Sequence, residues 1–112
     1  MTIREAAAML EAEILQDDFE DLPLQGAYTS DLLSDVMAHA KEGGALITIQ
    51  AHKNTVAVAS LVNISLIIIC NNRPVQDNEM LASAKDEGIA VIRTKQNQFA
   101  VSGKLYSAIH TT

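Results

Sequence analysis

Three short apolar runs, each ended abruptly by polar or basic residues, constrain the fold of this chain more than any other feature. They occupy residues 45–49, 64–70 and 89–92 and consist mainly of Ile, Leu, Val and Ala. Runs of this length and composition are typical of strands buried on both faces, as in a parallel sheet covered by helices. Because open α/β folds usually bind ligands at the carboxyl ends of such strands, we expect the chemistry of the molecule at that edge.

The composition fits one globular domain over residues 1–112. The apolar fraction of 48% is too high for a disordered chain, and the length allows a substantial core. No apolar run approaches the roughly 20 residues needed to cross a bilayer, and the N-terminus shows no apolar signal region. We therefore expect a cytoplasmic protein that makes no membrane contact. Cys70 ends an apolar run, and we expect it to be buried and unreactive.

The net charge of −6 is concentrated, because six acidic residues lie in the short stretch from residue 11 to residue 21. A protein that binds nucleic acid polymers or anionic membranes normally carries the opposite charge over a broad face, so we expect neither partner. Four of the eight basic residues nevertheless follow the apolar runs directly: Lys53, Arg73, Arg93 and Lys95. A basic rim on an acidic protein favours a small anionic ligand.

The pattern along the chain predicts a layered α/β fold with a mostly parallel or mixed sheet of about five strands flanked by helices. We expect strands over residues 13–16, 24–30, 45–50, 64–70 and 89–92, with the first as an antiparallel edge strand. We expect helices over residues 3–12, 31–41, 55–62 and 77–87. A terminal helix is expected to begin at Thr94 or Asn97 and to pack through Phe99, Leu105, Tyr106 and Ile109.

The sequence also predicts where the helices begin and end. Thr2 and Glu5 have the spacing of a capping box at the first helix. Side-chain caps for the next three helices are expected from Ser30 or Asp31, from Asn54, and from Asp77 or Asn78. Glycine is expected to end the second helix at Gly43 and Gly44 and to allow a bulge or a close backbone approach at Gly26.

Candidate ligand-binding residues lie where the predicted strands end. The most suggestive cluster is His52, Lys53 and Asn54, because a helix N-terminus after a strand favours an anion. The Tyr28 ring at the end of the second strand could stack on a base. The alternatives are a solvated turn, ordinary solubilising charges, and packing for Tyr28. The full candidate set is Tyr28, Ser30, His52, Lys53, Asn54, Asn71, Arg73, Arg93, Thr94 and Lys95.

No sequence pattern supports catalysis, a metal site or a cofactor. His39, His52 and His110 lack a second ligand at metal-binding spacing, and one cysteine excludes a thiolate cluster. The chain contains no G-x-x-x-x-G-K-[ST] phosphate loop, no G-x-G-x-x-G fingerprint and no G-x-S-x-G elbow. We therefore expect a protein that is not an enzyme and that needs no cofactor.

Four segments taken in order resemble the DRTGG domain family: residues 28–37, 40–43, 47–52 and 54–59. The resemblance extends over about residues 3–109, so nearly the whole chain is similar to this one domain. Gly26 matches a glycine of the motif that names the family. Leu22, Gln25 and Ala27 stand where more typical members carry Arg, Thr and Gly, so a contact from that Arg is not expected here.

The resemblance implies a fold similar to the N-terminal domain of HPr kinase/phosphorylase. DRTGG domains occur within some phosphate acetyltransferases and between nucleotide-sensing CBS domains of certain inorganic pyrophosphatases. There they are regulatory, contribute to dimer contacts and in some cases bind nucleotides, so the resemblance implies a homodimer and a nucleotide or other phosphorylated ligand. Members are sometimes labelled HPr serine kinase, an activity that the missing phosphate loop argues against here.

Two functions stay open on these grounds. The first is a non-catalytic regulatory or sensor domain that binds a small anionic ligand, such as an adenine nucleotide, at the carboxyl edge of the sheet. The basic residues after the strands favour it. The second is an interaction module that self-associates or docks on a metabolic or signalling enzyme, with no small-molecule ligand. The aliphatic composition favours this alternative.

Overall fold

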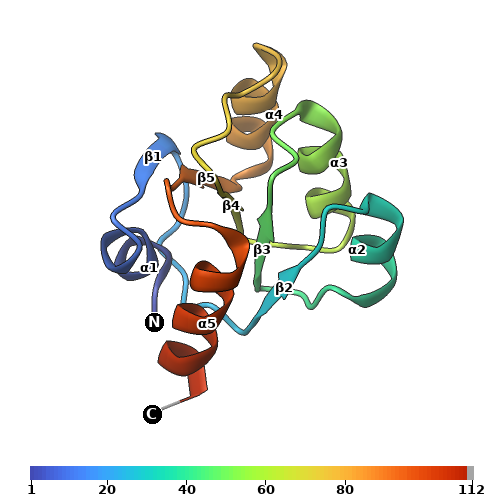
Figure 1. Ribbon diagram of the computed structural model, residues 1–112. Helices are drawn as coiled ribbons and strands as arrows, with labels where there is room; N and C mark the ends of the chain where they lie inside the picture. Colours follow the sequence, from blue (N-terminus) through green and yellow to red (C-terminus); the bar gives the residue numbers. More distant parts are fainter. Residues whose placement is uncertain (111–112) are drawn as a thin grey trace.

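The computed structural model describes residues 1–110 and holds a five-stranded sheet between two layers of helices (Figure 1). The strands are β1 (Glu13–Gln16), β2 (Ala27–Thr29), β3 (Ala45–Thr48), β4 (Leu66–Ile69) and β5 (Ala90–Arg93). The helices are α1 (Ile3–Met9), α2 (Leu33–His39), α3 (Lys53–Leu61), α4 (Glu79–Glu87) and α5 (Gln98–His110). The predicted layered α/β fold with a mixed sheet is therefore confirmed.

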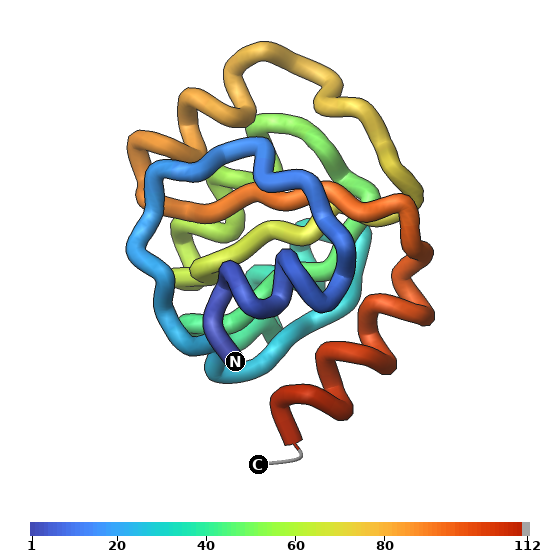
Figure 2. Tube along the Cα trace, turned by 90° about the vertical axis from the view of Figure 1, so that its left-hand side faces the viewer, coloured from blue at the N-terminus to red at the C-terminus, as the bar shows by residue number. Residues whose placement is uncertain are grey.

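The strand order across the sheet is β1-β5-β4-β3-β2. Strands β2 to β5 run parallel to one another, and β1 pairs with β5 in the antiparallel direction, as predicted for residues 13–16. The parallel strands therefore place all four of their carboxyl ends along one edge of the sheet. Figures 1 and 2 show α5 running from this edge toward the end of the molecule at which the N-terminus lies.

Alternate side chains of the strands build two separate cores. On one face, Ile47, Ile68 and Ile92 pack with residues of α1 and α5. On the other face, Leu46 and Ile67 pack with residues of α2, α3 and α4. Because helices cover both faces, the central strands are buried along their whole length, which explains their continuous apolar runs.

Several predicted helix boundaries are confirmed. The capping box at the first helix is present, with the Thr2 backbone N–H donating to Glu5 Oε1 at 2.8 Å. The terminal helix follows Asn97, whose Oδ1 accepts from the Ala100 N–H at 2.9 Å. Asn97 rather than Thr94 is therefore the start signal of α5.

Other predicted helix ends are wrong. The N-caps of α2 and α3 are Leu32 and His52, and neither side chain caps its helix. Asn54 lies inside the first turn of α3, and the Asp31 carboxylate turns toward β3 instead of toward α2. Helix α2 already ends at His39, before the two glycines.

The close backbone approach predicted at Gly26 requires glycine at Gly44 instead, because a Cβ atom on Gly26 would meet no atom within 4 Å. A Cβ atom on Gly44 would lie 2.9 Å from the Gly26 carbonyl oxygen, so a side chain would force the two segments apart. That carbonyl accepts a hydrogen bond from the Ala45 N–H, which opens the pairing of β2 with β3. Glycine is thus required at position 44 by the packing of neighbouring backbone segments.

Two further expectations fail. The strand predicted over residues 24–30 is only Ala27–Thr29, because Leu24 N–H bonds to the Met1 carbonyl and does not extend the strand. The terminal helix buries Val101 and Leu105, whereas Phe99 and Tyr106 are 89% and 69% exposed. No helix among residues 1–110 has both the length and the apolar character to cross a bilayer.

Candidate functional site

The loops that follow the four parallel strands meet at the carboxyl edge of the sheet, where the sequence places its candidate residues. Two loops follow β2 and β3, and two follow β4 and β5. We call these the β2–β3 half and the β4–β5 half of the edge. Their electrostatic character differs, because carboxylates organise the first and basic side chains gather at the second.

The Asp31 carboxylate organises the β2–β3 half. Its Oδ1 accepts hydrogen bonds from Thr48 Oγ1 and from the Ile49 backbone N–H, both at 2.9 Å. The Gln98 side-chain amide, at the start of α5, donates to both carboxylate oxygens at 3.1 and 3.2 Å. The carboxylate therefore joins β2, β3 and α5, and its hydrogen-bonding capacity is used within the protein.

His52 belongs to the same network through Gln50. The Gln50 side-chain amide donates to the Asp31 carbonyl at 3.1 Å, and its Oε1 lies 3.1 Å from His52 Nε2. His52 is half-buried in this position. The predicted candidate at the end of β3 is thus held in place by the segment that follows β2.

Ser30 and Tyr28 make local contacts rather than facing the carboxyl edge. Ser30 Oγ accepts from the Leu32 backbone N–H at 3.2 Å. The Tyr28 hydroxyl donates to Asp35 Oδ2 on α2 at 2.7 Å, and this bond raises the pKa of Tyr28 above its ordinary value. The Tyr28 ring is half-buried in the core shared with α2, so packing accounts for it.

The N-terminus of α3, where an anion was expected at residues 52–54, is occupied by the Asp77 carboxylate. Asp77 Oδ2 accepts from the Lys53 backbone N–H at 3.1 Å, while Oδ1 accepts from the Glu79 and Met80 N–H groups at 3.1 and 2.8 Å. One carboxylate therefore serves the first turns of both α3 and α4. These backbone donors lower the pKa of Asp77.

Lys53 and Asn54 do not form the anion site that was predicted with His52. Lys53 Nζ lies 2.8 Å from Glu79 Oε2 in an exposed ion pair. Asn54 is exposed in the first turn of α3. With Asp77 on the amides and Glu79 on the ammonium group, the protein itself supplies the negative charge that this helix end attracts.

The β4–β5 half is built from two loops held together by backbone hydrogen bonds. The Asn71 N–H donates to the Gln96 carbonyl at 2.9 Å, and the Asn72 N–H donates to the Thr94 carbonyl at 2.8 Å. Both asparagines have positive φ, 59° and 49°, and the Arg73 N–H closes the turn onto the Cys70 carbonyl at 3.2 Å. Asparagine tolerates this left-handed backbone better than most residues, which explains the Asn-Asn pair.

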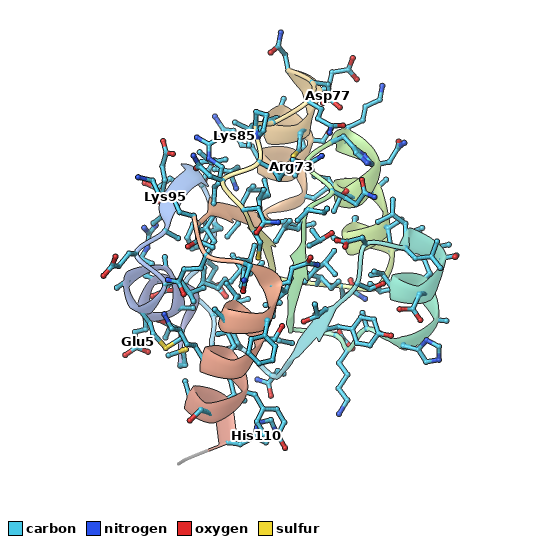
Figure 3. All side chains as sticks on the ribbon, in the orientation of Figure 1. Glu5, Arg73, Asp77, Lys85, Lys95 and His110 are labelled. Atoms are coloured by element: carbon cyan, nitrogen blue, oxygen red, sulfur yellow. The ribbon has the colours of Figure 1, made fainter. Side chains whose placement is uncertain are left out.

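Three basic residues, Arg73, Arg93 and Lys95, lie on or next to these joined loops. Arg93 Nη2 bonds to Glu13 Oε1 on β1 at 2.9 Å, and Nη1 lies 3.5 Å from the Arg73 carbonyl. Arg93 Nε is buried and has no acceptor within the described residues. Arg73 and Lys95 form no ion pair in the described part of the chain, and Figure 3 labels both close to these loops.

The side chains of Thr94 and Cys70, at the ends of β5 and β4, are buried in the protein interior. The Thr94 hydroxyl donates to the Leu10 carbonyl at 3.0 Å, so this candidate side chain ties β5 to the end of α1. Cys70 is fully buried, and burial raises the pKa of its thiol to about 11. The predicted burial of Cys70 is confirmed. Among residues 1–110, no three potential metal ligands come together.

Sequence reasoning missed the roles of Asp31, Asp77 and Gln98. Asp77 caps α4 as predicted but also accepts from Lys53, 24 residues away. Asp31, in contrast, does not cap α2 and bonds instead to Thr48, 17 residues away. Gln98 donates to Asp31 across 67 residues of sequence. No local pattern distinguishes a carboxylate that caps its own helix from one that bonds to a neighbouring loop.

Comparison with known proteins finds a similar architecture among solved structures. No protein-family model matches the chain, and no curated protein sequence matches it. A solved structure does match, with a TM-score of 0.70 and 18% sequence identity: the CBS and DRTGG domains of the regulatory region of Clostridium perfringens pyrophosphatase, complexed with its activator diadenosine tetraphosphate. The match covers 93% of this chain and 45% of that chain, so this chain spans less than half of that region. At this identity the likeness shows a shared fold.

Proposed function

We propose that this chain is a non-catalytic regulatory domain of the DRTGG type that binds a small anionic ligand, such as an adenine nucleotide, at the carboxyl edge of its sheet. The observation that carries the proposal is the presence of Arg73 and Lys95, which form no ion pair within residues 1–110, on the two joined loops of the β4–β5 half. The similar pyrophosphatase region is regulatory and binds diadenosine tetraphosphate, which supports a nucleotide as the ligand class.

The chemistry of the two halves favours the β4–β5 half as the site of the phosphate groups. Phosphate oxygens need cationic or N–H donors, and Arg73, Lys95 and the side-chain amides of Asn71 and Asn72 offer both. The helix end at His52 and Lys53 is a poor phosphate site, because Asp77 and Glu79 already carry negative charge there. A phosphate at that end would have to displace a bound carboxylate.

Calorimetric titration of the purified chain tests the proposal, with AMP, ATP and diadenosine tetraphosphate as ligands and inorganic phosphate as a probe of charge alone. We expect at least one nucleotide to bind more tightly than inorganic phosphate. Arg73→Glu should weaken that binding at least tenfold. Lys41→Glu is the matched control, because it reverses an exposed charge just before the amino end of β3 and should leave the affinity unchanged.

Absence of heat with every nucleotide up to millimolar concentration would contradict the proposal. Equal loss of affinity in Arg73→Glu and Lys41→Glu would contradict the proposed half of the edge, since binding would then depend on net charge alone.

A cytoplasmic location and a metabolic or signalling enzyme as partner remain predictions.

The second candidate function is a protein-interaction module, including the expected homodimer. The observation that favours it is the outer edge of β2, which pairs only with β3 and contains no charged residue. Light scattering across a range of protein concentrations tests self-association, and it does so independently of any ligand. A monomer at all concentrations would count against this candidate and leave the ligand-binding proposal intact.

A further inference from the structure

The outer edge of β2 presents free backbone groups. Toward β3, the Gly26 carbonyl accepts from the Ala45 N–H, and the Ser30 N–H donates to the Ile47 carbonyl. Because successive residues of a strand direct their backbone groups to opposite sides, Ala27 and Thr29 direct theirs away from β3. Both residues are exposed. Natural edge strands usually carry a charge, a proline or a bulge that blocks pairing, and Ala27–Thr29 contains none of these.

Helix α5 places an apolar stripe beside this edge. The Ser102 hydroxyl lies 2.6 Å from the Thr29 hydroxyl, which fixes the helix next to β2. Phe99 and Tyr106 stand three residues before and four after Ser102, so they share its side of the helix. They are 89% and 69% exposed, and Leu32, just after β2, is 65% exposed. Three of the six large exposed apolar side chains among residues 1–110 therefore flank one strand.

A shallow cavity of about 150 Å³ lies between the strand and the helix. Tyr106 and Ile109 line it from α5, and Ala27 and Thr29 line it from β2. It offers room for an apolar side chain from outside.

We propose that this face pairs with the same face of a second copy, strand β2 against strand β2 in the antiparallel direction. With Tyr28 opposite Tyr28 on the two-fold axis, Ala27 of each copy lies opposite Thr29 of the other. Each of these pairs exchanges two backbone hydrogen bonds. The pairing thus satisfies all the outward groups of Ala27 and Thr29 and joins the two sheets into one. Antiparallel pairing of identical strands generates the two-fold symmetry of a closed dimer.

The packing of α5 fits such a dimer. The helix lies over β2 and β3, and strands are about 4.8 Å apart, so the two α5 helices would lie on the same face at roughly 10 Å. This is the usual distance between packed helices. Phe99 and Tyr106 of each copy would then lie between the two helices and lose their exposure to water.

The charge distribution favours a second copy as the occupant. Two chains of net charge −6 repel each other, but the acidic stretch from residue 11 to residue 21 includes β1, at the opposite edge of the sheet. Pairing through β2 keeps these stretches as far apart as the fold allows. The inference deepens the second candidate function, and it does not depend on whether a nucleotide binds.

Sedimentation equilibrium of the wild-type chain and three variants tests the inference. Ala27→Pro removes an outward N–H that forms no hydrogen bond within residues 1–110, and Phe99→Glu places a charge on the apolar stripe. Both should weaken the dimer at least tenfold. Leu61→Glu is the control, because Leu61 is 72% exposed on α3, on the other face of the sheet, and should leave the dimer unchanged.

Amide spectra of each variant show that it remains folded, and Phe99→Glu keeps the test valid if proline perturbs β2. A monomeric wild-type chain at concentrations near 1 mM would overturn the inference. So would a dimer that both edge variants leave intact, or one that Leu61→Glu dissociates. Failure of this test would not affect the titration of nucleotides, which reports on the loops after β4 and β5.

Discussion

The two halves of the carboxyl edge use the same fold in opposite ways. In the β2–β3 half, the Asp31 carboxylate takes up the donors at the end of β3, and the Asp77 carboxylate, from the loop after β4, takes up those at the N-terminus of α3. In the β4–β5 half, backbone bonds close the loops, and the Arg73 and Lys95 side chains have no carboxylate partner within the described residues. The difference teaches that a helix N-terminus after a strand is an anion site only when no carboxylate of the same chain already fills it.

The largest expected effect is a loss of stability on breaking the Asp31 network. Asp31→Ala leaves Thr48 Oγ1, the Ile49 N–H and the Gln98 amide without their shared acceptor, so we expect a loss of about 2 kcal/mol in the free energy of unfolding. Urea denaturation measures it. Asp31→Asn keeps one acceptor oxygen and should lose less. Equal stability of all three proteins would show that the β2–β3 half is not held together by this carboxylate.

The second effect is on ligand affinity and separates the two halves. Lys95→Glu places a negative charge beside the joined loops of the β4–β5 half, where we propose that phosphate binds. We expect the affinity for the best-binding nucleotide to fall about tenfold, equivalent to about 1.4 kcal/mol, with little change in urea stability because Lys95 is exposed. Unchanged affinity would show that Lys95 does not contribute to phosphate binding.

The third prediction concerns acid stability. Backbone donors, that of Lys53 first, lower the pKa of Asp77 in the folded state below its ordinary value. The stabilisation is therefore present above the ordinary pKa and is lost as the pH falls through the lowered one. Asp77→Asn should be less stable than the wild type at neutral pH, and the gap should narrow below about pH 4. A pH-independent gap in urea midpoints would contradict this cause.

The smallest expected effect is that of Lys53→Ala. Its ammonium group pairs with Glu79 in an exposed contact, and such pairs contribute little to stability. We expect unchanged urea unfolding and nucleotide affinity within about twofold of the wild type. A tenfold loss of affinity would indicate that the phosphate binds at the N-terminus of α3. The proposed difference between the two halves would then be wrong.

The sequence predicted the layered fold well, because it depends on local signals. The apolar runs gave β3, β4 and β5, the capping box at Thr2 gave α1, and the antiparallel edge strand lies at residues 13–16 as expected. Neighbouring parallel strands also bring the basic residues after β4 and β5 together. These features follow from periodicity and strand adjacency alone.

The parts that sequence reasoning missed depend on long-range contacts. Asp31 was assigned by position as the cap of α2, but distant donors hold its carboxylate. Asp77 caps α4 as predicted, and it also takes the N-terminus of α3 that was assigned to Asn54. Phe99 and Tyr106 have the helical spacing of core residues, yet α5 turns them outward beside β2. Periodicity gives the face of a helix, but only the neighbouring strands show whether that face is covered.

Amide NMR titration of the full chain with the best-binding nucleotide tests the contrast between the two halves most directly. We predict chemical-shift changes in residues 71–73 and 93–96, with the amides of Lys53, Glu79 and Met80 unmoved because Asp77 still holds them. Shifts confined to residues 52–54 and 77–80 would contradict the account, because the ligand would then have displaced the Asp77 carboxylate.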